Sequence, residues 1–225
     1  MSRLGILGGT FDPIHMGHLD VARASADALH LERVRLLPSN IPPHRREPGT
    51  SAFHRFALVC LAAGADPRFE ADDAELLRSG PSYAADTLRQ VQRQGWKADQ
   101  LFFVTGADAF AEIATWKDYP ALLDLAHFVA CSRPGRPAAV VRGLLPALQN
   151  RMVDARDFRN GAGTRVILLD AVTADVSSSA LRDALAGGAT EDTLRGMLPS
   201  GVAAHIRKHG LYSSTRLNFP GSAQH

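Results

Sequence analysis

The chain has 225 residues, of which 45% are hydrophobic and 21% charged, and its formal net charge at pH 7 is +2. These values are typical of one compact globular domain, and the small net charge argues against a dedicated nucleic-acid-binding protein. No signal segment and no apolar run long enough to cross a bilayer is evident, so we predict a cytoplasmic protein with reduced, buried thiols at Cys60 and Cys131.

A turn rich in glycine and histidine follows the first expected strand. The apolar run at 4–7 predicts a buried strand, and the Ala-rich run at 19–29 predicts a helix. Between them stands Gly8-Gly9-Thr10-Phe11-Asp12-Pro13-Ile14-His15-Met16-Gly17-His18. Glycines let a ligand approach the backbone, and a helix N-terminus offers N–H groups to phosphate. If the helix begins near Pro13 or Ile14, His15 and His18 share one face, although each feature alone also fits a purely structural turn.

The next segment predicts two more strands and two helices. A strand at 34–37 ends at Pro38, and the loop at 39–46 carries a small cationic cluster or is simply a solvated turn. A helix over 51–63 should face the core with Phe53, Phe56, Ala57, Cys60 and Leu61. A short strand at 69–71 precedes a helix that is capped by Ser82, buries Ala84, Thr87, Leu88 and Val91, and ends near Gly95.

The middle of the chain predicts the clearest buried strand, at 101–104. It leads to a turn in which Asp108 is either a helix N-cap or an acceptor for ribose hydroxyls. Short helices are expected at 109–116 and 120–125, with Trp116 between them as core or as an aromatic face for a ring. A further strand at 127–131 leads into the loop at 132–135.

The last third predicts a helix at 138–148, a surface loop at 156–164 and a last strand at 166–169. A helix then opens with Ser177, Ser178 and Ser179, and Arg182 lies one turn in; these residues are ordinary caps or phosphate ligands. Short helices follow at 192–198 and 202–209, and residues 213–225 should form a disordered tail.

The alternation of strands and helices predicts an α/β fold with a doubly wound, Rossmann-like parallel sheet. We expect a single domain at 1–212 with a small C-terminal helical part. Every polar cluster falls where a strand leads into a helix, so the clusters should meet at the carboxyl edge of the sheet.

The complete set of motifs resembles the bacterial nicotinate-nucleotide adenylyltransferases of the nucleotidyltransferase α/β phosphodiesterase superfamily. The His-x-Gly-His and Ser-Ser-x-x-x-Arg elements are superfamily-wide, and the Pro-Pro-His-Arg loop, the Ser-Tyr helix start and Trp116 narrow the resemblance. The matching segments are Gly8–His18, Pro42–Arg45, Glu75–Arg78, Ser82–Tyr83, Thr87–Leu88, Gly106–Asp108, Trp116, Arg133–Gly135, Val176–Arg182 and Gly210–Tyr212.

The resemblance implies adenylyl transfer from ATP to nicotinate mononucleotide, which yields nicotinate adenine dinucleotide and pyrophosphate in NAD biosynthesis. It implies that Mg²⁺ binds with the phosphates of ATP and that the protein has no nucleic-acid or membrane partner. A homo-oligomer remains possible. The implied catalytic residues are His15, His18 and Arg182. The implied ATP-binding residues are Gly8, Gly9, Thr10, Phe11, Gly106, Asp108, Ser178 and Ser179. The implied mononucleotide-binding residues are Asn40, His44, Arg45, Tyr83, Ala84, Trp116, Lys117 and Arg133.

The chain departs from the family pattern at two of these positions. Ala84 stands where family members often carry Thr, which leaves a main-chain contact available, and Lys117 stands where an aromatic residue is common.

Two rival functions remain open at this stage. One is a different adenylyl- or cytidylyltransferase of the superfamily, and the other is a catalytically silent nucleotide-binding module. The histidine pair could also bind Zn²⁺, but the sequence offers no third ligand at suitable spacing, so we expect no protein-bound metal.

Overall fold

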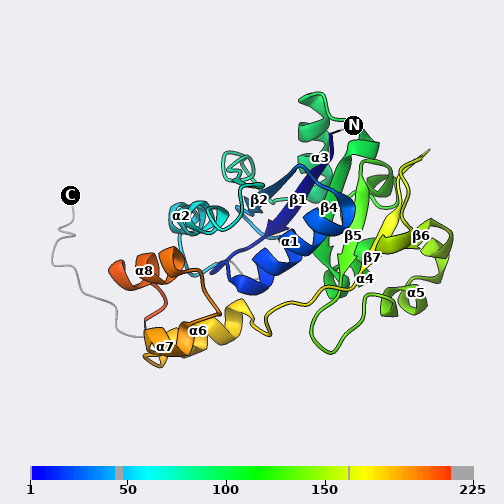
Figure 1. The fold of residues 1–225 in the computed structure, drawn as a ribbon. Helices are drawn as coiled ribbons and strands as arrows, with labels where there is room; N and C mark the ends of the chain where they lie inside the picture. The colour runs from blue at the N-terminus through cyan, green and yellow to red at the C-terminus, as the bar shows by residue number, and fades with distance from the viewer. Residues whose placement is uncertain (1, 44–47, 162, 214–225) are drawn as a thin grey trace.

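A computed structural model describes residues 2–43, 48–161 and 163–213. Its centre is one sheet of seven parallel strands in the order β3-β2-β1-β4-β5-β7-β6, with helices on both faces (Figure 1). The strands are β1 (Leu4–Gly9), β2 (Arg33–Pro38), β3 (Phe69–Ala71), β4 (Leu101–Gly106), β5 (His127–Cys131), β6 (Met152–Asp154) and β7 (Val166–Leu169). This arrangement confirms the predicted doubly wound α/β fold.

The helices occupy the connections between these strands and the C-terminal part of the described chain. The α-helices are α1 (Met16–Leu29), α2 (Ala52–Ala63), α3 (Ala84–Arg93), α4 (Ala107–Ala111), α5 (Val140–Leu144), α6 (Ser178–Ala186), α7 (Glu191–Leu194) and α8 (Ser200–Lys208). The 3-10 turns are η1 (Ala98–Gln100), η2 (Ile113–Thr115), η3 (Ala121–Asp124), η4 (Pro146–Arg151) and η5 (Ala155–Asp157).

Two hydrophobic cores cover the two faces of the sheet. Alternate residues of the strands pack against α1, α2, α6, α7 and α8 on one face, as Phe102 and Val104 of β4 do. The intervening residues pack against α3, α4, α5 and η3 on the other face, as Leu101 and Phe103 do. All five residues of β5 are buried, as expected of a strand that is covered on both sides.

The buried face of α2 differs from the predicted one. Arg55, Leu58, Val59 and Ala62 are buried, whereas Phe53 is 89% exposed. Leu61 and Cys60 are exposed as well, and Phe56 and Ala57 are only partly buried, so the predicted stripe and the predicted burial of Cys60 are wrong. The helix is apolar on two faces, and the face that packs on β2, β3 and α8 is the one that carries an arginine. Cys131 is buried as predicted.

Three smaller predictions also need correction. The N-cap of α3 is Tyr83, because the Ser82 hydroxyl accepts a hydrogen bond from the Asn40 N–H instead (2.9 Å). Ala85 is buried on α3, whereas Ala84 is only partly buried. The short edge strand β6 was not predicted, because its three residues carry no clear hydrophobic alternation.

Among the described residues, no helix has the length and apolar character needed to span a membrane. Residues 214–225 lie outside the described part of the chain, so the predicted tail and the domain boundary before it stay predictions.

Candidate active site at the carboxyl ends of the strands

The turn after β1 brings the two motif histidines into contact. His15 is the N-cap residue of α1, and its ring stacks on that of His18 with centroids 3.7 Å apart. The helix begins at Met16, slightly later than predicted. A β-carbon on Gly9 would lie 2.8 Å from the ring of Phe11, which is buried and has a φ of 49°. The turn therefore needs glycine at that position.

The surroundings of the two histidines affect their protonation in different ways. The His15 backbone N–H donates to Nδ1 of His18 (3.2 Å), so a neutral His18 ring carries its proton on Nε2. His15 is only 5% exposed, and burial together with the positive charge of Arg133 lowers its pKa to about 4. At neutral pH, His15 is therefore an uncharged imidazole with one N–H donor.

Asp12 joins three parts of the chain beside these histidines. Its carbonyl accepts a hydrogen bond from Arg182 (2.7 Å), and its carboxylate accepts one from the hydroxyl of Tyr212 (2.8 Å) and one from the Gly49 N–H (3.3 Å). Burial raises the pKa of Tyr212, so the phenol keeps its proton and acts as the donor.

The start of α6 lies against the same turn, beside the start of α1 (Figure 1). The hydroxyl of Ser178 donates to the Pro13 carbonyl (2.9 Å), and Arg182 also donates to the Ser179 hydroxyl (3.1 Å). Ser177 is the N-cap and accepts from the Ala180 N–H. Hydroxyl, guanidinium and helix-start N–H groups thus lie beside the turn that leads to the histidine pair.

A second charged pair lies at the ends of β4 and β5. Arg133 forms an ion pair with Asp108 (3.1 Å) beside Gly106. Gly106 is the N-cap of α4 and Asp108 lies within its first turn, so the N-cap interpretation of Asp108 is wrong. Since Arg133 also acts electrostatically on His15, this pair belongs to the same site.

The predicted mononucleotide side lies around the start of α3. Lys117 donates to the Asp86 carboxylate (2.9 Å) and lies over the Tyr83 ring at 4.9 Å. Trp116 is partly buried and packs edge-on against Phe103, with ring centroids 6.0 Å apart. Trp116 therefore contributes in part to the core, and its role as an aromatic face for a ring stays a prediction.

Asn40 borders this region from the end of β2. Its side-chain amide donates to the Arg78 carbonyl (3.1 Å), which ties the β2 loop to the segment before α3. That segment is held by a buried network in which Glu75 bonds the Thr87 hydroxyl and pairs with Arg78. Burial raises the pKa of Glu75.

The two predicted halves of the site lie close together where β1 pairs with β4. A β-carbon on Gly8 would lie 3.7 Å from Phe103, the residue on which Trp116 packs. His44 and Arg45 were also predicted for the site, and they lie outside the described residues.

Sequence reasoning missed three residues at this edge. They are the buried Arg55, Tyr212 as the partner of Asp12, and Ser39, whose buried hydroxyl has no hydrogen-bond partner in the described structure. A buried arginine has no signature in an apolar periodicity, which counts it as a surface residue.

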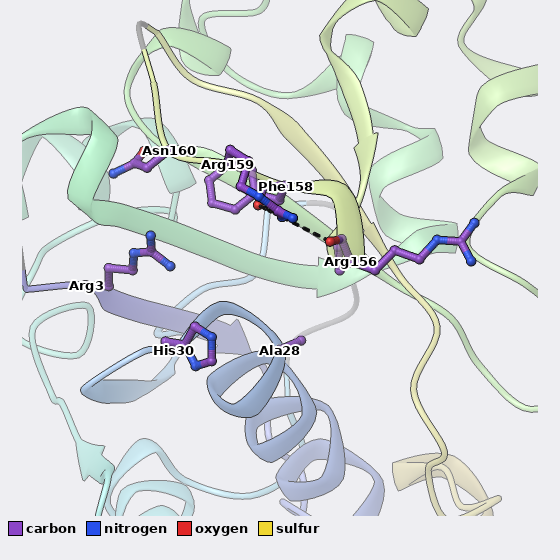
Figure 2. Close-up of a pocket in the computed structure, with 8 residues that line it drawn as sticks. Arg3, Ala28, His30, Arg156, Phe158, Arg159 and Asn160 are labelled. Carbon is purple, nitrogen blue, oxygen red and sulfur yellow. Dashed lines mark hydrogen bonds between the residues drawn. The ribbon is translucent and has the colours of Figure 1, made fainter.

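Neither of the two described cavities is lined by the motif histidines or by Arg182. One, of about 400 Å³, lies by the amino end of β1; Figure 2 shows it, with Arg3, His30 and Asn160 around it and Arg156 pointing away. The other, of about 410 Å³, lies between the segment before α2 and the segment after α8, and Tyr212 borders it. Within the described ranges, no group of three or more His, Cys, Asp or Glu side chains is arranged to hold a metal ion.

Comparison with known proteins gives the chain its relatives. The model of the cytidylyltransferase-like family matches residues 6–184. A probable nicotinate-nucleotide adenylyltransferase of Aeromonas hydrophila is 42% identical over 213 residues, which cover 93% of this chain and 96% of that protein. A protein of the same name from Syntrophotalea carbinolica is 37% identical over 217 residues, covering 94% of this chain and 98% of that protein.

Solved structures share the fold at much lower identity. Plasmodium falciparum nicotinic acid mononucleotide adenylyltransferase complexed with APC has a TM-score of 0.70 and 16% identity, with 94% of this chain and 98% of that chain covered. The same enzyme complexed with NaAD gives a TM-score of 0.69 at 15% identity and the same coverage. At such identity the likeness concerns the fold alone.

Proposed function

The chain belongs to the cytidylyltransferase-like family and, more closely, to the nicotinate-nucleotide adenylyltransferases, and from this we infer that it transfers the adenylyl group of ATP to nicotinate mononucleotide. The products are nicotinate adenine dinucleotide and pyrophosphate, a step of NAD biosynthesis. The observation that carries this function is the stacked histidine pair at the start of α1, in the turn to which Arg182 and the start of α6 are bonded.

The reaction needs no nucleophile from the protein. The phosphate of the mononucleotide is anionic at neutral pH, and its oxygen attacks the α-phosphorus of ATP while pyrophosphate leaves. The protein contributes position and charge stabilisation. We propose that His15 and His18 donate hydrogen bonds to the reacting phosphate, and that neither acts as a base.

The phosphate-binding groups follow from the same geometry. Gly8, Gly9, Thr10 and Phe11 would face the triphosphate through the backbone, while Ser178, Ser179 and Arg182 would bind the leaving phosphates. Gly106 and Asp108 would reach the ribose, and the Asp108–Arg133 pair would open to release both side chains for ligand. We also propose that the protein resides in the cytoplasm.

The donor set at this edge suits a cation that is carried by the substrate. The carboxylate of Asp12, in the turn that leads to His15, is already bonded to Tyr212 and Gly49, so it is not free to bind a cation. We propose that Mg²⁺ enters with ATP and takes its ligands from phosphate oxygens and water. When bound, it would offset the charge that develops on the leaving pyrophosphate.

Selection of the mononucleotide is proposed for the start of α3. Tyr83, the N-cap residue, makes no capping hydrogen bond through its side chain, so N–H groups of the first turn are left for a ligand. A nicotinate carboxylate accepts such bonds with both oxygens, whereas the NH₂ of nicotinamide would face donors. Lys117 pairs with Asp86 there and offsets the one carboxylate of that turn. Trp116 would stack on the pyridine ring, and Asn40, His44, Arg45 and Arg133 would bind the phosphate.

The test is pyrophosphate release from ATP with nicotinate mononucleotide, nicotinamide mononucleotide and phosphopantetheine as acceptors. We expect kcat/KM to favour nicotinate over nicotinamide mononucleotide at least tenfold. The charge-assisted bonds of the carboxylate, together with the repulsion between the nicotinamide NH₂ and the helix-start donors, amount to about 2–4 kcal/mol. Ala84→Ser should keep the preference, because main-chain groups carry it. Equal values for both pyridine nucleotides would reject the helix-start account, and absence of release with every acceptor would favour a silent binding module.

A further inference from the structure

A fully buried arginine lies beneath the loops of the proposed site. Arg55 of α2 is 1% exposed. Its guanidinium donates to four carbonyl groups: Thr10 (2.8 Å), Ser39 (2.7 Å), Thr50 (3.3 Å) and Asn40 (3.4 Å). All four acceptors are backbone groups, and each lies in a loop rather than in a helix or strand.

These acceptors belong to different sides of the site. Thr10 is part of the turn after β1, next to the glycines that would face ATP. Ser39 and Asn40 follow β2, on the side proposed for the mononucleotide, and Thr50 precedes α2. A single Nη1 atom bonds both Thr10 and Ser39, so one nitrogen joins the two sides directly.

Keeping a guanidinium there is energetically costly. Burial lowers the pKa of Arg55, and the nearby negative charge of Asp12 acts in the opposite direction. The group stays charged at neutral pH, because a guanidinium is not deprotonated in proteins. A hydrophobic side chain would fill this part of α2 at lower desolvation cost, as Leu58 and Val59 do one turn along. An arginine at this position therefore calls for an explanation other than packing.

We propose that Arg55 is a positioning residue that sets the distance between the ATP side and the mononucleotide side of the site. The inference rests on the proposed function, since it requires two substrates that meet across these loops. In-line transfer depends on the separation of the attacking oxygen and the α-phosphorus, and a misplacement of about 1 Å costs about 100-fold in rate. Arg55 touches neither substrate; it acts through the carbonyl groups of Thr10, Ser39 and Asn40.

A lysine cannot replace it. Its ammonium is a point charge with three donors, whereas the planar guanidinium reaches acceptors on several sides at fixed angles. Arg55→Lys keeps the charge and most of the volume but loses the bridge between Thr10 and Ser39. The expected result is a fall in kcat of about 10- to 100-fold, with the KM of each substrate changed by less than about threefold.

The control is Arg151→Lys. Arg151 also joins separate segments, bonding the Leu123 carbonyl (3.0 Å) and the Thr164 hydroxyl (2.7 Å), but it lies where η4 ends, at the amino edge of the sheet. We expect this variant to lose stability and to keep its kcat. Thermal unfolding of both variants allows all rates to be compared well below their melting temperatures.

A second variant tests the geometry by rescue. Arg55→Ala removes the bridge, and millimolar, non-denaturing guanidinium should restore part of kcat, whereas sodium chloride at equal ionic strength should not. The proposal is overturned if Arg55→Lys keeps normal kcat, if the loss appears in one KM only, or if neither Arg55 variant folds, since Arg55 would then serve stability alone. Wild-type turnover with nicotinate mononucleotide, measured in parallel, separates these outcomes from failure of the proposed function.

Discussion

At the residue scale, the stacked histidines owe their roles to unequal surroundings. His18 is fixed in one tautomer, because its Nδ1 accepts the His15 backbone N–H. His15 is buried, and a lowered pKa keeps it uncharged. An uncharged His15 ring can stack on the His18 ring at 3.7 Å without the repulsion that two imidazolium ions would suffer. The sequence predicts the pair, but the low pKa of His15 comes from burial and from Arg133, which no local pattern contains.

His18→Ala should lower turnover at least 100-fold, since a preorganised donor to a developing negative charge contributes about that much to rate. The fold should persist, because the residue lies at the edge of the sheet. Steady-state kinetics and thermal unfolding of the variant check both statements. Near-normal turnover in a folded variant would remove His18 from the reaction.

The lowered pKa of His15 predicts a loss of stability in acid. Unfolding returns the ring to its ordinary pKa of 6.5, so the unfolded chain binds the extra proton first as the pH falls from 6.5 to about 4. The contribution of His15 is present in full above pH 6.5 and amounts to about 3 kcal/mol, from a shift of about 2.5 pH units. Urea unfolding across this range should show the decline, and His15→Gln should flatten it. An unchanged slope in that variant would contradict the assignment.

At the scale of elements, α6 supplies the groups that face the histidine pair. Arg182 lies one turn into this helix and bonds both Asp12 and Ser179. A serine-rich start followed by an arginine is visible in the sequence, and the strand order then brings it to the start of α1. The position of this element was therefore predictable once the fold class was known.

Arg182→Ala should weaken the binding of ATP more than the binding of the mononucleotide. The loss of a charged hydrogen bond costs about 1.5–3 kcal/mol, which corresponds to roughly 10- to 100-fold in affinity. Isothermal titration with a non-reactive ATP analogue and, separately, with nicotinate mononucleotide measures the two effects. Unchanged ATP affinity with lost mononucleotide affinity would show that the two subsites are assigned the wrong way round.

The element α2 shows why sequence reasoning partly failed. The predicted stripe of Phe53, Phe56, Ala57, Cys60 and Leu61 has helical spacing, and so does the buried set that contains Arg55. Hydrophobicity alone favours the first set, since arginine is seldom fully buried. What decides the matter is the set of loop carbonyl groups beneath the helix, and those groups come together only in the folded sheet.

At the scale of the whole molecule, the parallel, doubly wound sheet was predictable from the sequence, because strands and helices alternate throughout. The closing contact between Tyr212 and Asp12 was not. It joins residues 200 positions apart, and neither residue carries a local signal for the other. The Gly210-Leu211-Tyr212 segment is part of the family resemblance, but the sequence gives no indication of what Tyr212 does.

Tyr212→Phe should keep the fold and lose about 1–2 kcal/mol of stability, because the Asp12 carboxylate loses a buried donor. Turnover should fall as well, since the carbonyl of Asp12 holds Arg182. Urea unfolding and steady-state kinetics of the variant measure the two effects. A variant with full stability and full turnover would show that the contact contributes to neither property.

The contact between Tyr212 and Asp12 also has a consequence for synthesis on the ribosome. The glycine- and histidine-rich turn is made before its phenolic partner, which lies 200 residues further along the chain. Contacts between residues so far apart in sequence are slow to form, because closing the long loop between them costs entropy. Until Tyr212 has been made, the nascent chain therefore carries the glycine- and histidine-rich turn with an aspartate that still lacks this partner.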